Sequence, residues 1–211
     1  MSSKEVVSSN VVFWQDSGMK PSDKSNGYEE IAELFISERD SVTGVATVRQ
    51  WSRILARGSA ILDLGCGHGV PISQALMEEG FTVYGVDASA SLMESFRKRF
   101  PSAHAECSAI EDSAFFRRTF DAVVAVGLMF LLHPEIQSLL IRKVNQALNS
   151  NGRFLFTSPK EKCIWQDILT RRESVSLGAQ HYRNIVQAEG LILVGEMSDE
   201  GGNHYYSVRK P

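Results

Sequence analysis

The sequence contains few cysteines, and their spacing does not suit a disulfide or a shared metal site. Its 211 residues include only Cys66, Cys107 and Cys163, which lie far apart, and no Cys-x-x-Cys motif. This pattern excludes a disulfide framework and the usual zinc-binding spacing, so we expect no bound metal. Such cysteine usage is typical of proteins of the reducing cytoplasm.

The sequence also lacks an excess of basic residues and any long apolar run. Its formal net charge is −3 at pH 7, with a pI of about 6.0, which does not favour nucleic acid as a partner. No apolar run reaches the roughly 18 residues that a membrane span requires. Residues 1–10 lack the basic-then-apolar order of a signal peptide. We therefore expect a cytoplasmic protein without a membrane partner.

Strand and helix patterns alternate through most of the chain, which predicts an α/β fold with a doubly wound, mostly parallel sheet. The predicted strands are 60–64, 82–87, 104–109, 120–126, 153–157, 191–197 and 204–208. Helical patterns cover 70–79, 89–100 and 134–148, and two amphipathic stretches precede them at 28–38 and 45–57. The last two strands are close enough to form an antiparallel hairpin. Residues 1–26 are polar and Ser-rich, which predicts a flexible segment before a single domain at 27–211.

The most informative motif is a glycine-rich turn after the first predicted strand. Asp63 lies near the end of this apolar strand, and Gly65, Gly67 and Gly69 follow at alternate positions. Such glycines let the backbone adopt positive φ and approach a ligand closely. A helix pattern follows, so the ligand would lie near a helix N-terminus. The alternative is a turn that binds nothing, but three alternating glycines cost chain entropy.

A carboxylate, Asp87, ends the second predicted strand. It follows Gly65 by 22 residues, the place where nucleotide-binding βαβ units put an acid that accepts hydrogen bonds from ribose hydroxyls. Nicotinamide-binding proteins use the same device, but their GxGxxG fingerprint requires a third glycine where this sequence has Val70 or Ile72. The spacing therefore disfavours a dinucleotide.

The segment with Asp63 and the three glycines resembles motif I of the class I methyltransferases that use S-adenosylmethionine. Beyond motif I and Asp87, residues 108–112, 120–124 and 149–154 are similar to further segments of that family. The resemblance covers about residues 28–211. It implies a seven-stranded, mostly parallel sheet that ends in an antiparallel hairpin, with S-adenosylmethionine as cofactor and S-adenosylhomocysteine as product.

The resemblance also implies which residues bind the cofactor. Ile110 would cover the adenine and Glu111 would accept from its amino group, while Tyr28 would approach the sulfonium and Arg39 the carboxylate of the cofactor. The two amphipathic stretches, within residues 27–57, would form a helical lid over the cleft. The full predicted set is Tyr28, Arg39, Asp63, Gly65, Cys66, Gly67, Gly69, Asp87, Ala88, Ile110, Glu111 and Val126.

The acceptor side of the site has weaker signals. His133 follows the fourth strand at the sheet edge where ligands of open α/β folds bind, although a surface histidine before Pro134 explains it equally. His204 and Tyr205 open the last strand, where they are catalytic candidates or simply alternate across an edge strand. A looser group before the last strand pair contains Trp165 and Asp167.

These patterns predict an enzyme that transfers a methyl group from S-adenosylmethionine to a small-molecule acceptor by in-line displacement. Positioning supplies much of the catalysis of such a reaction. Two alternatives remain at this point. One is a sensor or pseudoenzyme that binds the cofactor without turnover, and the other is a nicotinamide-dependent oxidoreductase.

Overall fold

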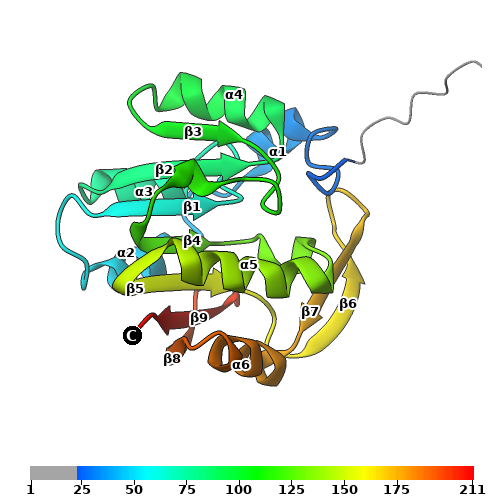
Figure 1. The fold of residues 1–211 in the computed structure, drawn as a ribbon. Helices are drawn as coiled ribbons and strands as arrows, with labels where there is room; N and C mark the ends of the chain where they lie inside the picture. The colour runs from blue at the N-terminus through cyan, green and yellow to red at the C-terminus, as the bar shows by residue number, and fades with distance from the viewer. Residues whose placement is uncertain (1–22) are drawn as a thin grey trace, which may run out of the picture.

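The strands form one large sheet and one separate hairpin (Figure 1). The computed structural model describes residues 23–211. The large sheet contains β1 (Ala60–Leu64), β2 (Thr82–Asp87), β3 (His104–Cys107), β4 (Phe120–Ala125), β5 (Leu148–Thr157), β8 (Ile192–Ser198) and β9 (His204–Arg209). The hairpin contains β6 (Lys162–Gln166) and β7 (Glu173–Leu177).

The large sheet has the order β3-β2-β1-β4-β5-β9-β8. Strands β1 to β5 run parallel to one another, and β9 is antiparallel to both β5 and β8. The predicted mostly parallel, seven-stranded sheet with a C-terminal antiparallel hairpin is therefore confirmed. The strand order reverses beside β1, because the chain passes from β3 at one edge to β4 on the other side of β1. Open α/β sheets bind ligands at the carboxyl ends of strands at such a switch point.

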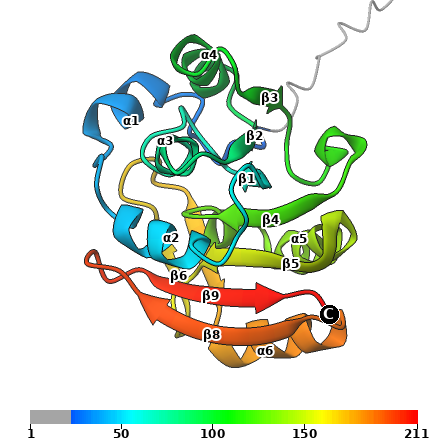
Figure 2. The ribbon, with the colours of Figure 1, turned by 90° about the vertical axis from the view of Figure 1, so that its left-hand side faces the viewer.

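Helices cover both faces of the sheet (Figure 2). They are α1 (Ala32–Glu38), α2 (Val45–Ser52), α3 (Ile72–Glu78), α4 (Ala90–Arg99), α5 (Pro134–Ala147) and α6 (Ala179–Ala188), with short 3-10 turns η1 (Phe115–Arg117) and η2 (Met129–Leu131). One core cluster joins α5 and α6 to one face, and a second joins α2 and α3 to the opposite face. Strands β1 and β4 lie between the two clusters, which explains why both are almost entirely apolar.

Several element boundaries differ from those predicted. Helix α2 ends at Ser52, and α1 begins only at Ala32, because residues 24–31 form turns. Strand β3 ends at Cys107, two residues early, and β5 begins at Leu148 with a register shift opposite β4. The β6–β7 hairpin and α6 were not predicted. Both strands of this hairpin are short and half-exposed, so their sequence carries little apolar pattern.

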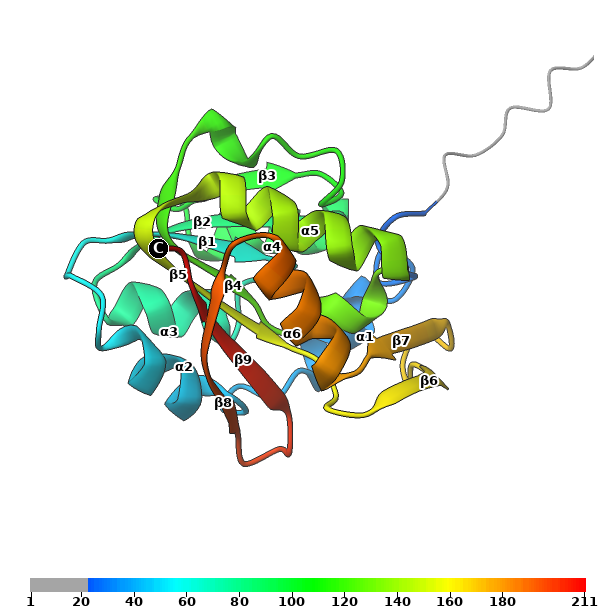
Figure 3. The same ribbon diagram turned by 60° about the horizontal axis from the view of Figure 1, so that its bottom comes forward.

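The hairpin β6–β7 projects from the sheet near the carboxyl ends of its strands (Figure 3). Its strand β7 packs against η2, the turn that follows β4. This places a segment that is distant in sequence beside the residues after β4. Within residues 23–211, we find no helix of sufficient length and apolar character to cross a membrane.

Candidate functional site

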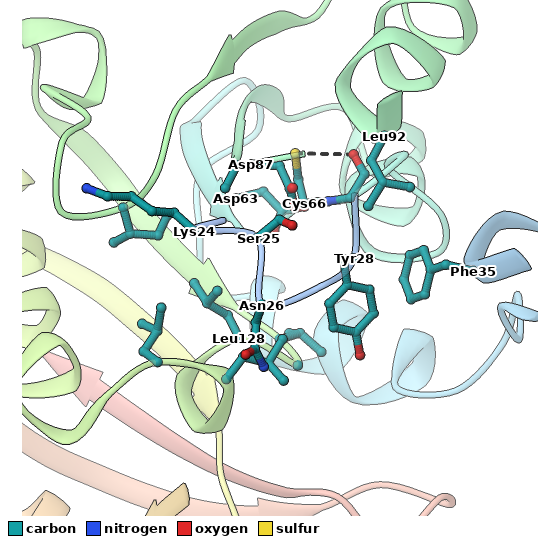
Figure 4. A pocket seen from close by; sticks show the side chains of 18 of the residues that line it. Lys24, Ser25, Asn26, Tyr28, Phe35, Asp63, Cys66, Asp87, Leu92 and Leu128 are labelled. Atoms are coloured by element: carbon teal, nitrogen blue, oxygen red, sulfur yellow. Dashed lines mark hydrogen bonds between the residues drawn. The ribbon is translucent and has the colours of Figure 1, made fainter. Parts of the chain in front are cut away.

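A large cavity opens at the carboxyl ends of β1, β2 and β4 (Figure 4). Eleven of the twelve predicted cofactor-binding residues line it: Tyr28, Arg39, Asp63, Gly65, Cys66, Gly67, Asp87, Ala88, Ile110, Glu111 and Val126. The structure thus brings together residues from five separate segments of the chain. The exception, Gly69, does not line the cavity.

Asp87 connects the glycine-rich turn to helix α4. Its Oδ2 accepts a hydrogen bond from the backbone N–H of Gly67 at 2.9 Å, and its Oδ1 accepts from the N–H of Ser89 at 2.8 Å. Burial raises the pKa of this carboxyl, while the two backbone donors act in the opposite direction. Each oxygen keeps a free lone pair, because a carboxylate can accept about four hydrogen bonds. The side chain is therefore fixed in place and still able to accept from a pair of hydroxyl groups.

The three glycines of the turn have different surroundings. Gly65 and Gly67 line the cavity with φ of +68° and +55°. Gly69 has φ of +87°, and a Cβ added there would lie 2.4 Å from Cε2 of Phe100. Gly69 therefore allows the turn to pack against α4, which is a structural reason for the glycine that the motif alone did not reveal.

Asp63 is the most deeply buried carboxyl of the site. It is 2% exposed, and its Oδ2 accepts a hydrogen bond from the Ser73 hydroxyl at 2.5 Å. Burial raises its pKa to about 7, with the nearby charge of Asp87 adding to the increase. A cationic group bound next to Asp63 would lower this pKa again, because an opposite charge favours the ionised form.

The loop after β3 is held by a lysine from helix α5. The Nζ of Lys143 donates to the carbonyl oxygens of Ile110, Glu111 and Ser113 at 2.7, 3.0 and 2.8 Å. It also lies 4.7 Å from the centre of the Phe115 ring. One ammonium group thus fixes the backbone of the two residues that line this end of the cavity.

Residues 23–30, which we call the strap, pass over the cavity. Tyr28 donates from its hydroxyl to Oδ2 of Asp167 at 3.1 Å, and Lys24 forms ion pairs with Glu111 and Asp112. At its other end, Glu29 accepts from the hydroxyls of Ser89 and Ser91, at the start of α4. Residues 1–22 of the predicted flexible segment 1–26 lie outside the described residues, and residues 23–26 belong to the strap.

The three predicted catalytic candidates, His133, His204 and Tyr205, do not line the cavity. His133 is exposed at the N-cap of α5, where its backbone and not its side chain caps the helix. His204 shares a hydrogen bond with Glu196 at 2.9 Å, and Tyr205 is fully buried and donates to Asp199 at 2.9 Å. These positions favour other residues for the acceptor side.

The cavity also contains residues outside the predicted cofactor-binding set. They are Lys24, Ser25, Asn26, Phe35, Val70, Ile72, Leu92, Gly127, Leu128, Phe130, Leu131, Leu132 and Asp167. Most are apolar residues without a recognisable motif. Asp167 had a signal, since it belonged to the loose group with Trp165, but no pattern indicated that the β6–β7 hairpin would carry it to the sheet edge. Within residues 23–211, no group of three or more His, Cys, Asp or Glu side chains is arranged to hold a metal ion.

The site has the donors and acceptors that a nucleoside with a cationic side chain requires. The cavity lining includes four carboxylates, those of Asp63, Asp87, Glu111 and Asp167. Arg39 is exposed at the cavity mouth, with its guanidinium 5.5 Å from the centre of the Phe35 ring. The residues present therefore fit S-adenosylmethionine, which combines ribose hydroxyls, an adenine, a carboxylate and two positive groups.

Comparisons with known proteins agree with this geometry. A family model described as a methyltransferase domain matches residues 61–152. Among curated proteins, carboxy-S-adenosyl-L-methionine synthase of Campylobacter jejuni is 27% identical over 135 residues, which cover 62% of this chain and 55% of that protein. The chain thus matches about half the length of this curated relative.

Two solved structures share the fold. One is a TehB-like SAM-dependent methyltransferase from Corynebacterium glutamicum, which is 20% identical with a TM-score of 0.66, over 88% of this chain and 97% of that one. The other is the CcbJ methyltransferase from Streptomyces caelestis, which is 14% identical with a TM-score of 0.74, over 89% of this chain and 99% of that one. At these identities the likeness concerns the fold.

Proposed function

We propose that the chain belongs to the class I S-adenosylmethionine-dependent methyltransferases and that it transfers the methyl group of this cofactor to a small-molecule acceptor. The observation that carries the proposal is the bridge from Asp87 to the backbone of Gly67, at the end of β2 and inside the cavity. This arrangement places a carboxylate that can bind ribose hydroxyls next to a glycine turn whose backbone can approach a nucleoside closely.

The residues of the chain divide the binding task among them. Asp87 would accept from the ribose hydroxyls, and Ile110 with Glu111 would hold the adenine. Arg39 would pair with the carboxylate and Asp63 with the ammonium group of the cofactor. When bound, the cofactor supplies a methyl group on positively charged sulfur, which an acceptor atom displaces in line. The strap excludes water and holds the two reactants in position, which is a major source of rate in such a reaction.

The strap supports a small acceptor. Its contacts to Asp167, Glu111 and Ser89 anchor it over the cavity at three places, and the acidic balance of the chain does not favour RNA or DNA. We test the proposal by incubating the protein with S-adenosylmethionine and extracts of small metabolites, followed by mass spectrometry. We expect S-adenosylhomocysteine together with a product heavier by one methylene unit. A modified S-adenosylmethionine without S-adenosylhomocysteine would instead indicate a synthase and contradict the proposal.

The glycine turn offers a first test, because we assign cofactor binding to Gly67 and packing to Gly69. Gly69→Ala should lower the free energy of unfolding by more than about 2 kcal/mol, because positive φ and overpacking against Phe100 add together. Gly67→Ala should cost only about 1 kcal/mol, since its Cβ would lie 3.3 Å from Phe35. Gly67→Ala should, however, lose more cofactor affinity. Thermal melts and calorimetric titrations of both variants check the result, and equal effects on binding would contradict it.

Lys143 offers a second test, because it acts on the adenine end only through the loop backbone. Lys143→Met should weaken binding of S-adenosylhomocysteine about tenfold, since Ile110 and Glu111 lose a common anchor. Lys210 is the matched control. Its Nζ donates to the carbonyl oxygens of Asn145 and Leu148 at 2.7 and 2.9 Å, far from the cavity. Lys210→Met should lose similar stability and no affinity, whereas an equal loss of affinity in both variants would refute the role of Lys143.

A further inference from the structure

The cavity extends beyond the residues assigned to the cofactor. This remaining end is lined by Asn26 of the strap, by residues of the segment after β4, and by Asp167 of the β6–β7 hairpin, and Tyr28 lies between it and the cofactor end. We propose that this remaining end holds the methyl acceptor, and that the acceptor is an amine with a neighbouring hydrogen-bond-accepting oxygen on an apolar body. The inference rests on the proposed function, since it concerns the second substrate of the same site.

An apolar wall forms one side of this acceptor end. It consists of Leu128, Phe130, Leu131 and Leu132. The Phe130 ring lies 5.4 Å from the ring of Trp165, so the wall is packed against the β6–β7 hairpin. Leu132 also packs against the core cluster beneath α5. A wall of this kind binds an aliphatic or aromatic body by removing its surface from water.

Asp167 is the charged group that lines this end of the cavity together with the apolar wall. Its Oδ1 accepts from the backbone N–H groups of Leu169 and Thr170 at 2.9 and 2.8 Å, which fixes the carboxylate in the hairpin turn. In the part of the chain that the structure describes, its Oδ2 accepts only from the Tyr28 hydroxyl, at 3.1 Å. Within residues 23–211, no lysine, arginine or histidine forms an ion pair with it. A carboxylate with a free lone pair in a mostly apolar setting selects an N–H donor or an ammonium group.

Asn26 adds a complementary requirement. Its Nδ2 is buried and finds no hydrogen-bond partner among residues 23–211. Figure 4 shows Asn26 and Tyr28 extending from the strap into the cavity. A buried donor without a partner is costly, so a ligand that brings an acceptor oxygen is favoured here. The site therefore favours a molecule with two features, a nitrogen donor that binds Asp167 and an oxygen acceptor that binds Asn26.

The transfer to such an acceptor balances without another reactant. The amine nitrogen forms the new bond to the methyl carbon with its lone pair, and the electron pair of the carbon–sulfur bond moves to sulfur, which leaves the neutral thioether of S-adenosylhomocysteine. The methylated nitrogen then carries the positive charge. An acceptor that binds as an ammonium must first release one proton through Oδ2 of Asp167 to water, which frees the lone pair of the nitrogen, and no further proton transfer is then needed for the charges to balance.

Four probes with the same phenyl ring and similar chain length test the acceptor class. They are phenylalaninamide, 2-phenylethylamine, 3-phenylpropionamide and 3-phenylpropionate. Dissociation constants are measured by ligand-detected nuclear magnetic resonance on protein saturated with S-adenosylhomocysteine. We expect phenylalaninamide to bind best and 3-phenylpropionate worst, with the amine about tenfold tighter than the acid, because only an N–H group satisfies Asp167.

Asp199 provides a matched control for Asp167. In the turn between β8 and β9, its Oδ1 accepts from the backbone N–H groups of Gly201 and Asn203, and its Oδ2 accepts from the Tyr205 hydroxyl. This repeats the contacts of Asp167 at a place that does not line the cavity. Asp167→Asn should abolish the preference for amines while the affinity for S-adenosylhomocysteine stays unchanged. Asp199→Asn should leave both unchanged.

The outcomes separate this inference from the proposed function. Failure of the wild-type protein to bind S-adenosylhomocysteine would overturn the proposed function, and the inference with it. If that compound binds but the acid is preferred, or none of the four probes binds, only the acceptor class is wrong. An effect of Asp199→Asn without one of Asp167→Asn would also overturn it and would move the acceptor to the side of His204 and Tyr205.

Discussion

Asp63→Asn should be more stable than the wild-type protein at pH 8 and bind S-adenosylmethionine less tightly. The prediction follows from the burial of the Asp63 carboxyl, which lowers the stability of the fold above pH 4 and which we assign to cofactor binding. Asp63 is 2% exposed, and its pKa is raised from 3.8 to about 7, mainly by burial. Asparagine has nearly the same shape and keeps an oxygen that can accept from Ser73.

The sign of the effect follows from proton linkage. Below pH 4 the folded and unfolded chains both carry a neutral Asp63, so its contribution to stability is fully present. Between about pH 4 and 7 only the unfolded chain ionises, and the free energy of unfolding falls by about 1.4 kcal/mol per pH unit. The total loss is about 4 kcal/mol and is complete above pH 7. Asparagine does not titrate, so the variant avoids this loss.

Thermal melts at pH 4.5, 6 and 8 measure the difference between the two proteins. The gap in melting temperature should be small at pH 4.5 and should widen as the pH rises. Calorimetry at pH 7 should also show that the wild-type protein releases part of a proton when it binds S-adenosylmethionine, because a cation beside Asp63 lowers its pKa. A constant gap at all pH values, or equal proton release by Asp63→Asn, would contradict this account.

Asp87→Ala should lose about 1.5–3 kcal/mol of cofactor binding, which is the usual contribution of a hydrogen bond to a charged group. In the proposed binding mode the carboxylate would accept directly from the ribose hydroxyls, and it also holds the N–H of Gly67 in place. Both losses weaken binding, so the dissociation constant for S-adenosylhomocysteine should rise by a factor of about 10 to 150.

Asp121 is the matched control for this change. It lies on β4, where its Oδ2 accepts from the N–H of Ala60 and its Oδ1 from the amide of Asn149. It therefore makes the same kind of contacts as Asp87, outside the cavity. Asp121→Ala should lower the melting temperature with little change in binding. If both variants lose affinity equally, the effect of Asp87 is a matter of stability and not of ribose recognition.

The sequence was sufficient for the parts of the fold and site that depend on short stretches of chain. The apolar strand before Gly65 and the strand that ends at Asp87 are each a few residues long, and a parallel sheet brings their carboxyl ends together automatically. The same holds for the loop with Ile110 and Glu111, which follows the neighbouring strand β3.

The rest depended on contacts between distant segments. The proposed joint role of Asn26 and Asp167 depends on contacts that join the strap to the β6–β7 hairpin. These are the hydrogen bond from the Tyr28 hydroxyl to Asp167 and the ion pair of Asp23 with Arg172. Neither segment has a periodic apolar pattern that would indicate this pairing. For Gly69 the motif predicted a ligand contact. In the structure this position packs against Phe96 and Phe100, which leave no room for a Cβ.

The most direct test of the central claim is a calorimetric titration of the wild-type protein with S-adenosylhomocysteine and, separately, with NAD. We predict saturable binding of S-adenosylhomocysteine at one site per chain, and no binding of NAD, because Val70 stands where a dinucleotide fingerprint requires glycine. Binding of NAD, or no binding of S-adenosylhomocysteine by the folded protein, would contradict the claim that the cavity beside Asp87 is a methyl-donor site.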